Sequence, residues 1–284
     1  MSVQSFTIAS SLAEALAALA VGARPVAGGT DLVVGARQGK APLPESIVAI
    51  DRLEELRGLR EASGRLELGA LATHAEIASS PAVLEWFTAL SDASAIVGSH
   101  ATRAHGTIGG NVMNASPAME TGGPLICFGA MAVLRSASGE RTVPVEELFA
   151  SPGRTTAGPG ELLVRIDLPQ QPPGTGSCYL RLEYRRQMEI AVVGATAAVA
   201  LEDGVVTHAR VAITALAPTI RRVPAAEAAL VGSDGNAQAA ADLAAEAATP
   251  ISDVRASERY RRSMTAVIAR RAIESAVARA GGAS

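Results

Sequence analysis

The sequence predicts an α+β protein built from two domains of unequal size. Strand-like and helix-like segments alternate through about the first 170 residues, and three strand-like runs followed by alanine-rich helical segments fill the rest. Between these two parts, Pro169–Gly176 reads PQQPPGTG, which continues neither a helix nor a central strand. We therefore expect one domain over residues 1–172 and a smaller C-terminal domain over residues 173–284, the latter an antiparallel sheet with helices.

The first fifty residues predict a small lobe in which strands are followed by helices. Ser11-Leu12-Ala13-Glu14 is a capping-box pattern that opens a helix over about residues 11–20. Arg24–Ala27 is a short extended segment, and Gly28–Asp31 forms a glycine turn ahead of an apolar helical run. The apolar residues 47–50 add a further strand.

The next hundred residues predict a second lobe. Residues 66–68 alternate as a half-buried strand does, Thr73–Glu76 is another helix start, and a longer helix is expected over about residues 81–97. Gly106–Gly123 contains five glycines and is expected to be a long structured loop. Later strands are expected at residues 131–134 and 162–168.

Beyond the boundary, the pattern predicts three strands and then helices. The strands are expected at residues 179–184, 190–201 and 205–216. A last helix is expected over about residues 257–279.

The composition excludes several classes of protein. With 25 basic and 28 acidic residues the formal charge is −3, and only 3% of residues are aromatic, so neither nucleic acid nor an anionic membrane is an expected partner. Cys127 and Cys178 are too few for a disulfide framework or an iron–sulfur cluster. The longest uncharged apolar stretches fall short of the ~20 residues that span a bilayer. The first twenty residues lack the basic start of a signal peptide, and we expect a cytoplasmic protein.

Two glycine turns are the strongest local indication of chemistry. Residues 27–32 read AGGTDL, and residues 107–111 read TIGGN. Glycines let the backbone come close to a ligand, and free N–H groups at a helix start attract phosphate. Two such turns suit a diphosphate, whereas either turn alone is also compatible with an ordinary tight turn.

No arrangement for acid–base, nucleophilic or metal catalysis is recognisable. The chain has no G-x-G-x-x-G after a strand, no H-E-x-x-H and no G-x-S-x-G. His74, His100 and His105 lie on expected loops or helix starts without a carboxylate pattern, which favours surface or capping roles. The pairs Arg185-Arg186 and Arg261-Arg262 are typical of solvated or subunit-interface charge. We predict no catalytic residue and no metal site in this chain.

Four motifs together resemble one protein family. They are RPVAGGTDL at residues 24–32, HGTIGGNVMNASP at 105–117, QMEIAVVGA at 187–195 and SERYRR at 257–262. In this order and at this spacing they resemble, over nearly the whole chain, the FAD-binding medium subunit of the molybdenum hydroxylases, the family of xanthine dehydrogenase and carbon monoxide dehydrogenase. The resemblance implies a two-lobed FAD-binding domain of the vanillyl-alcohol-oxidase type, with lobes at about residues 1–55 and 56–172 and FAD extended between them.

The same resemblance implies how the cofactor is held. Residues 25–32 would wrap the diphosphate through backbone N–H groups, and residues 107–111 would close over it from the second lobe. Glu120 stands where the family usually has Asp, a carboxylate that accepts hydrogen bonds from cofactor hydroxyls, and Arg181 matches a basic position that faces the cofactor.

Further matched positions lie along the flavin. Thr73 and His74 fall where the family runs past it, Val97 and Leu163 match positions that pack on the cofactor, and Ile190 matches a residue near the isoalloxazine ring. On pattern alone, these apolar residues are more typical of a core than of a cofactor site, and Thr73 is as typical of a helix cap as of a cofactor contact. The implied cofactor contacts are Pro25, Val26, Ala27, Gly28, Gly29, Thr30, Asp31, Leu32, Thr73, His74, Val97, Thr107, Ile108, Gly109, Gly110, Asn111, Ser116, Glu120, Leu163, Arg181, Glu189 and Ile190.

The function that the resemblance implies is electron transfer through FAD. Electrons would come from a small 2Fe–2S subunit and leave to an external acceptor, while a large molybdopterin-binding subunit oxidises the substrate, in a dimer of heterotrimers. The substrate and the acceptor, whether NAD, quinone, dioxygen or a carrier protein, stay open. Two alternatives also stay open: a stand-alone FAD-dependent oxidase or desaturase with His74 or Glu189 as base, and a scaffold that has lost FAD.

Overall fold

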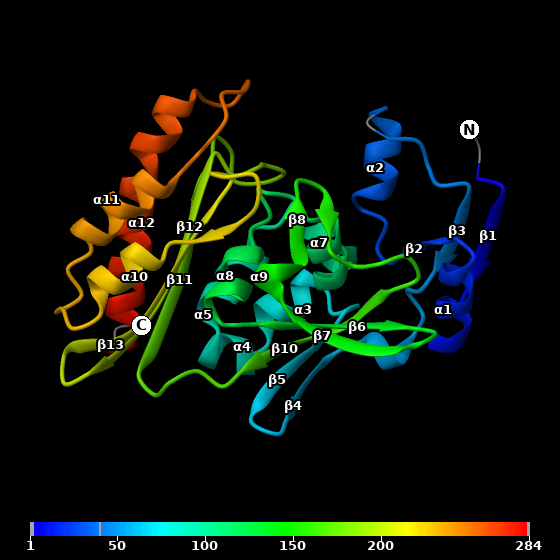
Figure 1. The fold of residues 1–284 in the computed structure, drawn as a ribbon, viewed down its shortest axis with the longest axis horizontal. Helices are drawn as coiled ribbons and strands as arrows, with labels where there is room; N and C mark the ends of the chain where they lie inside the picture. The colour runs from blue at the N-terminus through cyan, green and yellow to red at the C-terminus, as the bar shows by residue number, and fades with distance from the viewer. Residues whose placement is uncertain (1–2, 40, 283–284) are drawn as a thin grey trace.

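The chain folds into three units that follow one another along its length (Figure 1). A computed structural model describes residues 3–39 and 41–282. The first lobe is a three-stranded parallel sheet in the order β1-β3-β2. Its elements are β1 (Ser5–Ile8), α1 (Leu12–Ala20), β2 (Arg24–Val26), α2 (Leu32–Arg37) and β3 (Ser46–Ala49).

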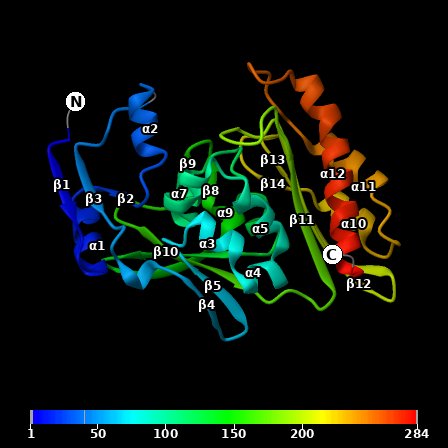
Figure 2. The ribbon, with the colours of Figure 1, turned by 180° about the vertical axis from the view of Figure 1, so that it is seen from behind.

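The two helices of this lobe differ in what they bury. Ser11 caps α1 by accepting the amide of Glu14 at 3.2 Å, and the apolar face of α1 packs into a core shared with strand β10 of the second lobe. Helix α2 buries none of its residues and projects from the lobe (Figure 1, Figure 2).

The second lobe is built on a five-stranded antiparallel sheet in the order β4-β5-β10-β6-β7. Both faces of its central strand are buried, because Ile166 and Leu168 lie in the core under the helices while Val164 lies against α1. The strands are β4 (Leu59–Ala62), β5 (Arg65–Gly69), β6 (Met131–Ser136), β7 (Gly139–Pro144) and β10 (Leu162–Pro169). The remaining elements are η1 (Glu54–Leu56), α3 (His74–Ser79), α4 (Pro81–Trp86), α5 (Thr88–Ala95), α6 (His100–His105), α7 (Ile108–Asn114), α8 (Gly122–Cys127), α9 (Val145–Leu148), β8 (Phe149–Ser151) and β9 (Arg154–Thr155).

The C-terminal part is a four-stranded antiparallel sheet covered by helices. A side chain on Gly176 of β11 would collide with the backbone of α12, so the long helix lies directly on the strand, and its alanines permit that approach. The elements are β11 (Thr175–Leu182), β12 (Val193–Glu202), β13 (Val205–Thr214), β14 (Arg221–Arg222), α10 (Pro224–Leu230), α11 (Gln238–Ala247) and α12 (Glu258–Ala280).

Two expectations from the sequence are wrong in detail. Gly106–Gly123 is not one long loop, because Thr107 accepts the amide of Gly110 and caps helix α7, and α8 begins before the segment ends. The helix expected over residues 81–97 is two helices, α4 and α5. They meet at Phe87, whose backbone is not helical and whose buried ring packs edge-on against Phe128 at a centroid distance of 5.1 Å.

The helices of the described ranges include none that could cross a membrane. The longest, α12, carries charged residues along its whole length.

An ion pair joins the second lobe to the C-terminal sheet and helix. Arg279 of α12 donates to both carboxylate oxygens of Asp92 on α5, at 2.6 and 3.1 Å, and to the carbonyl oxygen of Ser177 on β11 at 2.6 Å. Asp92 also accepts the amide of Tyr179 at 3.2 Å. One arginine therefore links α12, α5 and β11 across the boundary between the two domains.

Replacing Arg279 with Met should destabilise the chain. The variant leaves the part-buried Asp92 without its cation, and charge-assisted hydrogen bonds of this kind contribute about 1 to 3 kcal/mol to the free energy of unfolding. Urea unfolding followed by circular dichroism measures the loss. The control is Arg270→Met on the same helix, where the pair with Glu274 is exposed and its loss should cost under about 0.5 kcal/mol. Equal losses of unfolding free energy in the two variants would show that the contacts of Arg279 between the domains do not stabilise the chain.

Candidate cofactor site

The first glycine turn packs, across the lobes, against residues 105–106, which directly precede the second turn. A Cβ on Gly28 would collide with the carbonyl oxygen of His105, and one on Gly106 would lie 3.6 Å from the hydroxyl of Thr30. Backbone therefore packs on backbone where the first lobe meets the second, and Gly28 admits no side chain there.

The first turn offers unused backbone donors. Within the described residues, the amides of Gly28, Gly29 and Thr30 have no acceptor. Gly29 has a φ of +68°, a left-handed conformation that favours glycine, and α2 begins three residues later. The turn thus presents successive N–H groups, as an anion site does.

The second turn differs from the expectation that its amides are free. The amide of Ile108 bonds to the carbonyl oxygen of Ala72, and that of Gly109 to the carbonyl oxygen of Ala70, each at 2.9 Å. A Cβ on Gly109 would lie 2.6 Å from that same Ala70 oxygen. Packing against residues 70–72 therefore explains this glycine without a ligand.

The start of α7 uses the remaining amides of this turn. The hydroxyl and the carbonyl oxygen of Thr107 accept the amides of Gly110 and Asn111, at 3.1 and 2.9 Å. The amide of Thr107 itself has no acceptor among the residues that the structure describes. The second turn is hence held by its own hydrogen bonds and offers one unused N–H donor.

His74 lies beneath the point where the turns meet. Its own amide bonds to the carbonyl oxygen of Gly106 at 3.1 Å, and its side chain is 1% exposed, with an Nδ1 that has no partner in the described part of the chain. Burial, aided by the nearby Arg103, lowers the pKa of His74 from 6.5 to about 4, so its imidazole is neutral. Thr73 forms a capping box with Glu76, as its helix-cap interpretation predicts.

A loop from the C-terminal part reaches the other end of α6. The amide of Met188 bonds to the carbonyl oxygen of Gly98 at 3.0 Å, and the hydroxyl of Thr102 approaches the Met188 sulfur at 3.7 Å. Two residues on, Ile190 exposes 46% of its surface. The loop thus presents an exposed apolar side chain two residues after its contact with Gly98. The neighbouring Val97 is held through its carbonyl oxygen, which accepts a bond from Arg103.

Glu120 and Arg181 are engaged with each other. Their side chains form a buried ion pair, and Arg181 also contacts Glu183 and the carbonyl oxygen of Glu189. Burial raises the pKa of Glu120, and the positive charge of Arg181 opposes that shift. The two side chains are thus paired with each other inside the protein, where the sequence implied a separate contact of each with the cofactor.

Three further predicted residues have a structural role of their own in the second lobe. Leu163 is 2% exposed in the core of the second lobe, and Ile108 lies in the same core. Ser116 accepts the amide of Ala118 in a local turn.

Sequence reasoning missed Gly98 and Arg103. Gly98 has a φ of +53° and receives the C-terminal loop, and Arg103 is buried and holds Val97. A glycine and an arginine between two recognised motifs carry no pattern of their own, so only their contacts reveal them.

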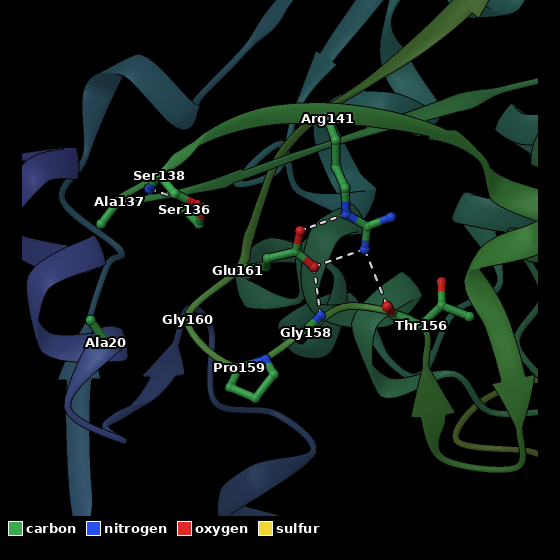
Figure 3. Close-up of a pocket in the computed structure, with 10 residues that line it drawn as sticks. All are labelled: Ala20, Ser136, Ala137, Ser138, Arg141, Thr156, Gly158, Pro159, Gly160 and Glu161. Carbon is green, nitrogen blue, oxygen red and sulfur yellow. Dashed lines mark hydrogen bonds and ion pairs between the residues drawn. The ribbon is translucent and has the colours of Figure 1, made fainter.

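A surface hollow lies elsewhere, between the end of α1 and the β6–β7 hairpin (Figure 3). There the carboxylate of Glu161 accepts bonds from Arg141 and from the amide of Gly158 (Figure 3). None of the predicted cofactor contacts lines this hollow, and its charged groups are already paired.

Comparisons with known proteins agree with this architecture. The family model "FAD binding domain in molybdopterin dehydrogenase" matches residues 2–171, and "CO dehydrogenase flavoprotein C-terminal domain" matches residues 179–276. The chain therefore belongs to the family of FAD-binding subunits of molybdopterin dehydrogenases.

Individual relatives cover nearly the whole chain. It is 31% identical to the 6-hydroxypseudooxynicotine dehydrogenase complex subunit alpha of Paenarthrobacter nicotinovorans, over 97% of this chain and 95% of that one. It is 30% identical to a putative xanthine dehydrogenase FAD-binding subunit of Escherichia coli, over 98% and 97%. The structure of carbon monoxide dehydrogenase from Hydrogenophaga pseudoflava superposes with a TM-score of 0.92 at 32% identity, covering 97% of both chains.

These findings confirm the resemblance, the two-domain fold and FAD as cofactor. The chain is an FAD-binding medium subunit of the molybdenum hydroxylase type, an oxidoreductase flavoprotein. The unused amides of residues 28–30 fit the diphosphate of FAD, because an anion with several acceptor oxygens needs several N–H donors at once.

The neutral His74 should make stability depend on pH. The unfolded chain binds a proton at His74 near pH 6.5 and the folded chain only near pH 4, so stability falls as pH drops through this window. Between pH 7.5 and pH 5 this one group should cost about 2 kcal/mol of unfolding free energy. Urea unfolding at both pH values measures it. His74→Gln should lack this component and the exposed His100→Gln should keep it; a wild-type pH dependence in His74→Gln would contradict the assignment.

Proposed function

We propose that this subunit holds FAD between its two lobes and passes electrons from an iron–sulfur partner subunit to an external acceptor. FAD, when bound, supplies the redox chemistry, and the chain supplies its position. The observation that carries the proposal is the packing of Gly28 against His105 and Gly106, next to the second glycine turn, with unused amides on the first turn.

The diphosphate end of the site is assigned to the two turns. The amides of Gly28, Gly29 and Thr30 would donate to the phosphates, joined from the second lobe by the amide of Thr107. The remaining predicted residues of the two turns, from Pro25 to Leu32 and from Ile108 to Asn111, would form the backbone that surrounds those donors.

The flavin end is assigned to the far end of α6. This helix spans six residues, or about 9 Å at 1.5 Å per residue, between the turn at Thr107 and the loop that carries Ile190. An extended dinucleotide with phosphates at the turns therefore brings its ring toward Ile190 and Val97. The Glu120–Arg181 pair would act here in two ways. It keeps opposite charges paired beside the ring, and Arg181 holds the backbone carbonyl of Glu189 in place.

The alternative of a stand-alone oxidase finds no free base at the flavin end. Glu189 is paired with Arg185 at 3.3 Å and accepts the amide of Ile190 at 3.0 Å. His74 is enclosed, and its pKa of about 4 makes it a weak base. Both groups that could abstract a proton are thus occupied or buried.

We extend the proposal to the assembly. Relatives are named as medium chains or FAD subunits of dehydrogenases, which supports partner subunits for this chain. We propose a large molybdopterin-binding subunit and a small 2Fe–2S subunit, assembled as a dimer of heterotrimers in the cytoplasm. We also propose residue 173 as the start of the C-terminal domain, because β10 ends at Pro169 and the next sheet begins at Thr175.

Gly28→Ala tests the diphosphate assignment. The added methyl group would push the first turn away from His105, so FAD binding should weaken by roughly tenfold, which corresponds to about 1.4 kcal/mol. Titration of the apo-chain with FAD, followed by flavin fluorescence, measures this change. The control is Gly35→Ala in α2, where a Cβ meets no atom within 4 Å, and which should bind FAD as the wild type does. Unchanged affinity in Gly28→Ala would contradict the assignment.

The electron-transfer role has its own test. The isolated chain loaded with FAD should show no bleaching of the flavin with candidate organic substrates, since Glu189 is paired and His74 is buried. Coexpression with a cysteine-rich small subunit and a molybdopterin-binding large subunit encoded nearby should yield a complex in which substrate bleaches the flavin. Substrate-dependent bleaching of the isolated chain would instead favour a stand-alone oxidase.

A further inference from the structure

Arg261 is buried although its neighbours in the SERYRR motif are exposed. Its side chain is 4% exposed, whereas that of Arg262 is 47% exposed and pairs with Glu258 one turn earlier on α12. The sequence favoured solvated or subunit-interface charge for this arginine pair. Arg262 is solvated, whereas Arg261 is buried and is not. A buried guanidinium is costly unless its donors are used, so its partners indicate its role.

The guanidinium of Arg261 joins two loops. Nη1 donates to the carbonyl oxygen of Val192 at 2.7 Å, and Nη2 donates to Asp253 at 2.6 Å. Asp253 in turn accepts the amides of Arg255 and Ala256, at 2.9 and 3.2 Å. Arg261 therefore fixes the base of the 183–192 loop to the segment that precedes α12.

The 183–192 loop is held at several further points. The hydroxyl of Tyr184 donates to the carbonyl oxygen of Arg255, and Arg181 donates to that of Glu189. Met188 reaches the second lobe through Gly98. Backbone contacts thus lie on both sides of Ile190, while its apolar side chain stays exposed.

A fixed backbone that presents a free apolar side chain is the arrangement of a preorganised binding surface. Ile190 is the residue that the proposed function places beside the flavin ring. Arg261 reaches no other part of the proposed site, so any effect on the cofactor must pass through Val192 and the loop.

We propose that Arg261 is a positioning residue, which acts through the carbonyl oxygen of Val192 to hold Ile190 against the isoalloxazine ring of FAD. The proposal rests on the proposed function and adds to it a role for the SERYRR motif. A purely structural role for Arg261 would alter the stability of α12 and leave the surroundings of the flavin unchanged.

Arg261→Met in the FAD-loaded subunit tests this role. The visible circular dichroism of the flavin and its midpoint potential should both change, and FAD should dissociate at least about threefold faster, because the ring loses a fixed neighbour. Arg261→Lys should recover part of each change, since an ammonium group can still donate to Val192. Arg262→Met, the adjacent exposed arginine, should match the wild type in all three measurements.

Several outcomes would overturn the proposal. A folded, FAD-loaded Arg261→Met with wild-type dichroism and potential would do so, as would equal changes in Arg262→Met. If Arg261→Met does not fold, Arg261→Lys and Tyr184→Phe decide, the latter removing an exposed tether of the same loop. Wild-type spectra and potential in both would overturn it. A wild-type chain that binds no FAD would instead refute the proposed function.

Discussion

The close packing of Gly28 on the His105 carbonyl is the constraint on which the site depends. It joins a parallel sheet and an antiparallel sheet that share little else than the core around α1 and β10. Because the backbone of one lobe packs directly on the backbone of the other, a side chain at Gly28 would push the lobes apart. The two turns consequently divide their tasks: the second is locked by its own hydrogen bonds, and the first keeps its amides unused.

The C-terminal part completes the site from outside the two lobes. Through Met188 its loop contacts Gly98, at the end of α6 that is remote from the glycine turns, and the Asp92–Arg279 pair fixes the sheet that carries this loop. A chain organised in this way positions a cofactor with backbone groups and apolar surface. Such an organisation needs no acid–base or nucleophilic residues of its own, because the electron chemistry resides in FAD.

The sequence predicted those parts of the fold that leave a periodic or capped pattern. Buried strands such as β10 and β12, and the capped helices α1 and α12, lie close to where their patterns indicated. Edge strands such as β1 and β7 were missed, because exposed residues such as Phe6 and Arg141 have no buried face to impose alternation. Helix α7 was missed because glycines disfavour a helix. Gly109 is required there by its close packing on Ala70, which the sequence alone does not reveal.

The candidate site was predictable to a similar degree. The glycine turns carry a local pattern, but the pairing of Glu120 with Arg181 joins residues 61 positions apart and could emerge only from the fold.

Helix α2 directly follows the glycine turn whose amides are unused, and none of its residues is fully buried. So short a helix is marginal in water by itself. In the free subunit its amide hydrogens will therefore exchange with solvent within a short time, while those of the locked turn at residues 108–111 stay protected. The proposed cofactor-binding surface thus has two parts. The turn at residues 108–111 is ordered by folding alone, and helix α2 becomes more ordered when the dinucleotide binds.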